Sequence, residues 1–219
     1  MTQPESRYRD GARAIAPIGV AAVVFGVSFG VLARTAGIGS VPAVVMSATT
    51  FAGSAQFAAA SILDDGGSIA SAVAAALLLN ARYAALSISV APGFGGRVWR
   101  RLLEAQTIVD ETWAVSARGR GRFEVPVMVG AGLVLYVGWV GGTLLGALSG
   151  DLLGNPERLG LDAAFPALFL ALLVPQLRDR RSIAAAVLGG LLALALVPWT
   201  PPGVPIIVGA AACLLGLRS

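Results

Sequence analysis

The chain has 219 residues, of which 56% are hydrophobic and 13% charged, and its mean hydropathy is +0.79. Its apolar blocks approach the ~20 residues that cross a ~30 Å hydrocarbon core, which excludes a soluble globular domain and indicates a polytopic membrane protein. The net charge of +4 does not indicate nucleic-acid binding, because the arginines lie in short loops between apolar blocks and report membrane topology.

Seven hydrophobic segments follow a polar N-terminal tail over residues 1–12. They predict an all-α polytopic membrane protein with a single integral membrane domain over 1–219. The last three segments are short, and prolines mark their breaks and turns. The segments are 13–33, 42–62, 68–91, 125–149, 160–177, 183–197 and 203–217.

Loop charges test how these segments cross the membrane. The loop over 97–122 is strongly basic and is expected in the cytoplasm, which places the acidic loop over 151–162 outside. Seven full spans then put the N-terminus outside, despite the arginines of its tail. If 42–62 instead enters and leaves on one side, as a re-entrant or broken element, the N-terminus lies inside. The sequence leaves both topologies open.

The basic loop contains a stretch, 102–118, with the pattern of an amphipathic helix. At 100° per residue, Ala105, Val109 and Thr112 share one side, while charged residues share the other. We expect one short helix at the cytoplasmic interface.

Two polar interruptions, at residues 51–57 and 80–83, lie inside membrane-length apolar segments. A charge well inside a bilayer costs about 2.5–3.5 kcal/mol on insertion scales, so an Arg there is normally kept for a partner or a pathway. Non-helical backbone at this depth is tolerated only where it is buried in protein or lines a wet cavity. Small hydroxyl residues such as Ser47 are more simply explained as helix-packing contacts. The candidate binding residues are Phe51, Gly53, Ser54, Gln56, Phe57, Asn80, Arg82 and Tyr83.

Asp110 and Glu111 are the acidic pair nearest the membrane entrance. The chain has no His, so a proton relay would have to use carboxylates of this kind, and the pair is a candidate for proton coupling or gating. A solvated surface pair is the alternative. Arg82 is expected either to meet an anionic substrate group or to pair internally with one of these two carboxylates.

Three glycines at four-residue spacing, Gly138, Gly142 and Gly146, form a small-residue stripe on the segment 125–149. Such a stripe predicts a packing surface, either within the chain or against a partner subunit.

An enzyme is not expected. All sixteen basic residues are Arg, so a Ser nucleophile would have neither a His nor a Lys as its base. The missing His also removes most metal sites, and no phosphate-binding loop of the Gly-x4-Gly-Lys type is present. We therefore expect no metal and no cofactor.

Several short motifs occur in order over residues 11–217. They are Gly30-Val31-Leu32-Ala33, Met46-Ser47, the stretch from Phe51 to Phe57, Leu79-Asn80-Ala81-Arg82-Tyr83, Ser89-Val90-Ala91-Pro92, Asp110-Glu111-Thr112, Leu161-Asp162, Phe165-Pro166-Ala167-Leu168-Phe169 and Val174-Pro175-Gln176. The set closely resembles the AzlC family, the large subunits of bacterial branched-chain amino acid exporters. One departure is Val109, where the family often carries Thr.

The resemblance implies an exporter of branched-chain and related apolar amino acids, driven by the proton motive force. It also implies a bacterial inner-membrane location and a separate small AzlD-like membrane subunit. In such a protein Arg82 would meet the substrate carboxylate, while Phe51 and Phe57 would line an apolar slot. The residues alone indicate a small secondary transporter. A channel-like or structural membrane subunit without proton coupling, and the membrane domain of an ATP-driven importer, remain alternatives.

Overall fold

The structure is a computed structural model that describes residues 4–119, 121–149, 170, 173–174, 177, 179–200 and 204–212. The acidic loop 151–162, the motifs between Leu161 and Phe169, most of segment 160–177 and part of segment 203–217 lie outside the described residues. The helices are α1 (Pro4–Thr35), α2 (Ser40–Thr50), α3 (Gly53–Asp64), α4 (Ile69–Val90), the 3-10 turn η1 (Ala91–Gly93), α5 (Val98–Ala105), α6 (Asp110–Ser116), α7 (Val125–Ser149), α9 (Arg180–Leu196) and α10 (Val204–Ala210).

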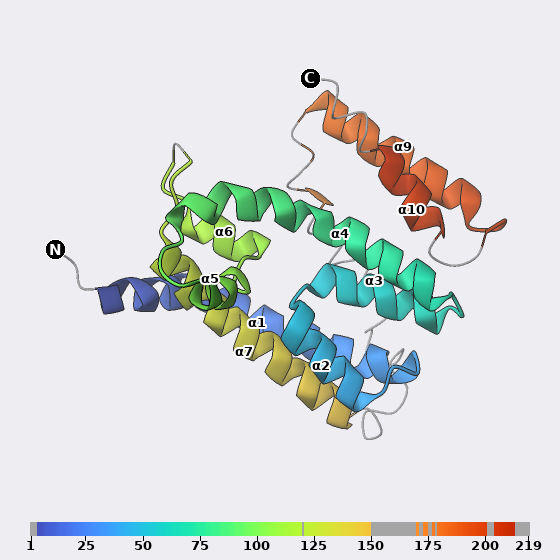
Figure 1. Cartoon of the computed structure of the whole chain (residues 1–219). Helices are drawn as coiled ribbons and strands as arrows, with labels where there is room; N and C mark the ends of the chain where they lie inside the picture. The colour runs from blue at the N-terminus through green and yellow to red at the C-terminus, as the bar shows by residue number, and fades with distance from the viewer. Residues whose placement is uncertain are drawn as a thin grey trace.

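Three helices of the described part are long and apolar enough to cross a membrane. They correspond to Arg7–Thr35 in α1, Ile69–Gly93 covering α4 and η1, and Val125–Ser149 in α7. The predicted all-α membrane class is confirmed. Figure 1 shows α1 and α7 lying side by side, with the shorter helices α3 and α6 between this pair and α4, and with α2 packed against α7.

The glycine stripe on α7 is the surface that packs against α1. A Cβ on Gly142 would collide with the carbonyl oxygen of Val23, and one on Gly146 would collide with that of Val27. Helices approach this closely only where neither side chain nor Cβ separates the backbones. The predicted packing surface is therefore confirmed as a contact within the chain.

Segment 42–62 is broken, as one of the two sequence hypotheses required. Helix α2 ends at Thr50 and α3 begins at Gly53, with Phe51 in the left-handed region at φ 43°. Met46 of α2 packs against the apolar cluster that includes Ala59 of α3, although a straight helix would place these residues about 20 Å apart. The segment thus folds back on itself, and both arms lie on one side of the break (Figure 1).

The single helix expected over 102–118 was wrong. The structure has two helices there, because the backbone leaves the helix after Ala105 and a new helix starts at Asp110. The amide of Ile108 still bonds to the carbonyl of Ala105, closing the last turn, and the Thr107 hydroxyl donates to Glu104 O over 2.6 Å. Val109 then runs extended into α6, and its buried side chain explains why the apolar pattern looked continuous.

The two broken segments meet in the middle of the molecule. Gln106 Nε2 donates to the carbonyl oxygen of Thr49 over 2.8 Å, so the end of α5 contacts the end of α2. From this region α3 and α6 run away in opposite directions, each with its first residue at the centre (Figure 1). Discontinuous helices that start at the midplane are typical of secondary transporters.

The N-terminal end of α1 and the loop 97–122 lie at the same end of the molecule. Arg7 Nη1 lies 3.5 Å from Glu124 Oε1, at the start of α7, and the opposite end of α7 receives a hydrogen bond from Arg34 to Ala147 O. This arrangement agrees with the topology in which 42–62 re-enters and disagrees with the one in which it spans.

Candidate functional site

A cavity of about 140 Å³ lies between the two breaks. It is well below the ~300–1,000 Å³ of pockets for drug-sized ligands, so it fits a small molecule. Its position near the middle of α1 and α7 puts it at membrane depth. The lining residues are Ile18, Ala21, Ala22, Phe25, Phe51, Gly53, Ser54, Arg82, Tyr83, Val109, Asp110, Glu111, Leu135 and Trp139.

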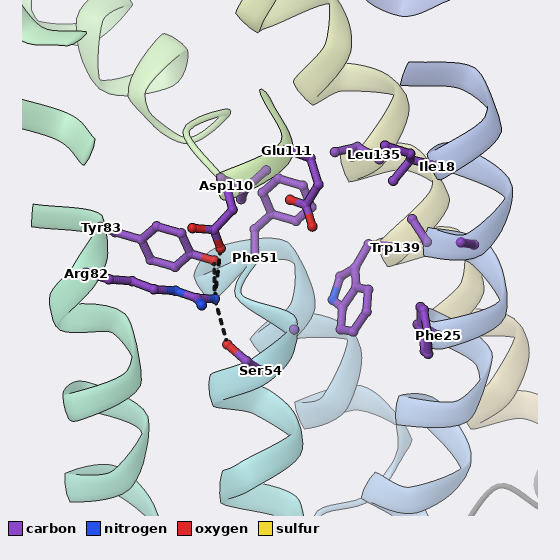
Figure 2. A pocket seen from close by; sticks show the side chains of 14 residues that line it. Ile18, Phe25, Phe51, Ser54, Arg82, Tyr83, Asp110, Glu111, Leu135 and Trp139 are labelled. Atoms are coloured by element: carbon purple, nitrogen blue, oxygen red, sulfur yellow. Dashed lines mark hydrogen bonds and ion pairs between the residues drawn. The ribbon is translucent and has the colours of Figure 1, made fainter. Parts of the chain in front are cut away.

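Seven of the predicted site residues share this cavity, although they come from three separate parts of the sequence. They are Phe51, Gly53, Ser54, Arg82, Tyr83, Asp110 and Glu111. Figure 2 shows Arg82 and Asp110 on one side, the apolar side chains of α1 and α7 on the other, and Glu111 between them. The cavity is therefore divided into a charged half and an apolar half.

Arg82 is the centre of the charged half. Its Nη2 lies 3.0 Å from Asp110 Oδ2, and the same nitrogen donates to Ser54 Oγ over 3.0 Å. The guanidinium carbon is 5.2 Å from the centre of the Tyr83 ring, in cation–π range. One guanidinium thus connects α4, α3 and α6, the three elements that carry the polar interruptions (Figure 2).

The ion pair with Asp110 leaves part of Arg82 unused. A guanidinium has five N–H donors, and the buried Nε has no hydrogen-bond partner in the described part of the chain. The side chains of Arg82 and Asp110 are 36% and 35% exposed, so the pair lies at the cavity wall and is open to a competing ligand.

Glu111 is the second acid of the cavity. It follows Asp110 in the first turn of α6 and lines the same cavity. Among the described residues no cation forms a salt bridge with Glu111, so its charge is available to a ligand.

The first turn of α3 forms another polar part of the wall. Gly53 and Ser54 are its first two residues and both line the cavity. The first N–H groups of a helix have no partner inside the helix, and the helix dipole favours an anion at this end.

The turn before α3 is made by Phe51 and not by Gly53, because only Phe51 has a left-handed φ. The ring of Phe51 packs edge-on against Tyr136, with ring centres 5.2 Å apart.

The remaining three predicted site residues do not line the cavity. Gln56 is fully buried and accepts from Ala52 N over 3.2 Å, which braces the break between α2 and α3. Phe57 is fully buried in the apolar core of α1, α3 and α7. Asn80 lies on α4, and its buried Oδ1 has no hydrogen-bond partner within the described residues.

The apolar half was missed in the sequence. Ile18 and Phe25 come from α1, while Leu135 and Trp139 come from α7, and all four sit in ordinary apolar runs (Figure 2). The one available signal was a large, polar-tipped Trp inside the glycine stripe, since a buried indole N–H needs a partner.

Comparison with known proteins places this arrangement in a family. A family model described as AzlC protein matches residues 17–153, which is more than half of the chain. A membrane protein of Archaeoglobus fulgidus is 36% identical over 86% of this chain and 84% of its own length. The inner membrane protein YgaZ of Escherichia coli is 26% identical, over 86% of this chain and 82% of its own length.

A Bacillus subtilis protein named branched-chain amino acid transport protein AzlC is 26% identical to this chain, over 79% of the chain and 69% of its own length. No solved structure matches. The residues matched by the family model include both breaks and every residue of the cavity. The chain belongs to the AzlC family.

Proposed function

We propose that this chain is the transporting subunit of a secondary exporter of branched-chain and related apolar amino acids. The observation that carries the proposal is the cavity, which combines a cation, two carboxylates and an apolar wall within about 140 Å³. An apolar amino acid at neutral pH presents the complementary groups, namely a carboxylate for the cation, an ammonium for a carboxylate and an apolar side chain for the wall. The name of the Bacillus subtilis relative supports this substrate class.

In the proposed binding mode the substrate carboxylate meets Arg82 and the first turn of α3. Both are suited to an anion, because the guanidinium is positively charged and partly exposed, and the dipole of α3 favours negative charge at its first turn. The carboxylate would compete with Asp110, which holds Arg82 in the structure described here. Asp110 then acts as an internal counter-ion in the absence of substrate.

The substrate ammonium meets Glu111, whose carboxylate has no other salt-bridge partner in the described chain. A carboxylate that binds either an ammonium or a proton links the two ligands by competition. At an acidic outer face Glu111 takes up a proton and releases the amino acid; at the inner face it loses the proton and binds the next one. This exchange makes export depend on the proton motive force.

The membrane orientation follows from the charges at the two ends. Arginines of the N-terminal tail and of the loop 97–122 share one end, which we assign to the cytoplasm of a bacterial inner membrane. We further propose that a small AzlD-like membrane subunit completes the transporter, as the family resemblance implies.

Counterflow of labelled leucine into proteoliposomes tests the proposal, with and without the small subunit and an imposed pH gradient. Exchange that accelerates when the outside is acidic is the expected result. Substrate flux that is indifferent to the gradient would instead support the channel-like or structural alternative. No exchange of any amino acid, with the small subunit present, would refute the proposed substrate class.

A further inference from the structure

We propose that Trp139, whose indole is hydrogen-bonded to Gln56, determines which apolar side chains the cavity accepts. The inference rests on the proposed amino-acid transport function, which it deepens by naming the specificity determinant. Trp139 lines the cavity, whereas Gln56 is fully buried and does not. Their roles follow from how the indole of Trp139 is held.

The indole closes the cavity between α7 and the start of α3. A Cβ placed on Gly53 would lie 2.9 Å from Trp139 Cη2 and 3.2 Å from Cζ3. The six-membered edge of the indole therefore abuts the first residue of α3, with no space for even one methyl group. Figure 2 shows the indole between the polar residues of the cavity and the side chains of α1, where it would limit the length of a substrate side chain.

Two phenylalanine rings prevent the indole from moving aside. Phe29 is stacked on it, with ring centres 6.0 Å apart and an interplanar angle of 21°. Phe57 contacts it edge-on, with centres 5.7 Å apart at 89°. Both rings are fully buried, so a rotation of Trp139 would have to displace packed core.

A closed circuit of buried hydrogen bonds fixes the indole further. Trp139 Nε1 donates to Gln56 Oε1 over 3.0 Å, and Gln56 Nε2 donates to Ser47 Oγ over 2.9 Å. Ser47 Oγ lies 2.8 Å from Thr143 Oγ1, which donates to Trp139 O over 2.9 Å. Thr143 has one hydroxyl hydrogen, so Ser47 is the donor to it.

Such a wall discriminates by size. One methylene in a rigid apolar pocket changes specificity by about 10–200-fold, and rigidity is what makes the difference large. The indole of Trp139 is held both by packed aromatic rings and by its hydrogen bond to Gln56, so this wall cannot shift to fit a larger side chain.

The test is the substrate selectivity of Trp139→Phe in counterflow, measured as the ratio of leucine to phenylalanine transport. The smaller ring removes the edge that faces Gly53 and lengthens the slot. We expect the ratio to fall about tenfold or more in favour of phenylalanine. Trp113→Phe is the matched control, because Trp113 also donates its indole N–H, to Ser89, but lies outside the cavity. Its ratio should stay that of wild type.

A second pair of variants keeps the inference testable if Trp139→Phe folds poorly. Gly53→Ala adds a methyl group against the indole and should reduce leucine transport more than alanine transport. In Gly53→Ala/Trp139→Phe the atoms that collide are gone, so leucine transport should recover relative to Gly53→Ala alone. Unchanged ratios in both single variants, or no recovery in a well-expressed double variant, would overturn the inference.

These outcomes are separate from a failure of the proposed function. If wild type exchanges no amino acid, the proposed function fails before selectivity is measured. If wild type exchanges leucine and the variants keep its selectivity, the function stands and Trp139 is only a packing residue.

Discussion

Replacing Arg82 by Gln tests the central contact of the cavity. The change removes the guanidinium and leaves a shorter, neutral polar side chain, so membrane insertion should not suffer, since a charge at membrane depth is itself costly. We expect leucine exchange to be abolished, or reduced to the limit of detection, while the amount of protein in the membrane stays near wild type.

The size of the effect follows from the interactions lost. A hydrogen bond to a charged group contributes about 1.5–3 kcal/mol, and every 1.4 kcal/mol is tenfold in affinity. Losing one such bond to the substrate carboxylate therefore weakens substrate binding about 10–150-fold. The loss of the ion pair with Asp110 adds less, because both side chains are more than a third exposed and solvent screens the pair.

The double variant Arg82→Gln/Asp110→Asn separates two explanations. If Arg82 serves only to neutralise Asp110, removing both charges restores exchange. If Arg82 binds the substrate carboxylate, the double variant stays inactive. Arg100→Gln is the matched control, because Arg100 pairs with Glu104 at 2.9 Å on the exposed surface of α5 and should leave exchange unchanged. Wild-type exchange by a well-expressed Arg82→Gln protein would refute a direct role.

Three further predictions address the second acid, the topology and the helix packing. Glu111→Gln removes the carboxylate that would bind the substrate ammonium or a proton, so it should abolish the acceleration of exchange by a pH gradient, and an unchanged gradient response would contradict this. Cysteines at Arg9 and Arg101 should be labelled from the same side of the membrane and one at Asp64 from the other side, whereas labelling of Arg9 and Arg101 from opposite sides would exclude the re-entrant topology. Gly142→Leu should reduce membrane yield or Tm strongly, because a side chain there collides with Val23 O. Gly141→Leu should be tolerated, because a Cβ at Gly141 would meet no atom within 4 Å, and equal yields for the two would show that α1 and α7 do not pack as described.

Local chemistry of the sequence predicted the polar half of the cavity. Arg82 and Gly53 stood out because a charge and a helix break are costly at membrane depth, whatever surrounds them. Asp110 was separated from Arg82 by a loop, and their pairing was one of two alternatives that only the fold decides. The energetic cost of a charge or a helix break at membrane depth thus identifies candidate residues in the sequence. Only the packing of the helices decides which of these residues come into contact.

The apolar half could not be predicted in the same way. Ile18 and Leu135 differ in no local respect from the many aliphatic residues that face lipid. The helix break at 106–109 was hidden for a related reason, because buried Ile108 and Val109 continue an apolar pattern that a helix would also produce. In a chain that is apolar on most faces, hydrophobic periodicity loses its power to tell core from surface.

The position of Arg82 suggests how the two broken segments are coupled. Its guanidinium bonds to Ser54 at the start of α3 and pairs with Asp110 at the start of α6, so one side chain joins elements that open toward opposite ends of the molecule. A substrate carboxylate that draws Arg82 away from Asp110 weakens the link to α6 and leaves the link to α3. Because only differential contacts shift an equilibrium between conformations, this exchange of partners is where substrate binding can favour one half of the transporter over the other.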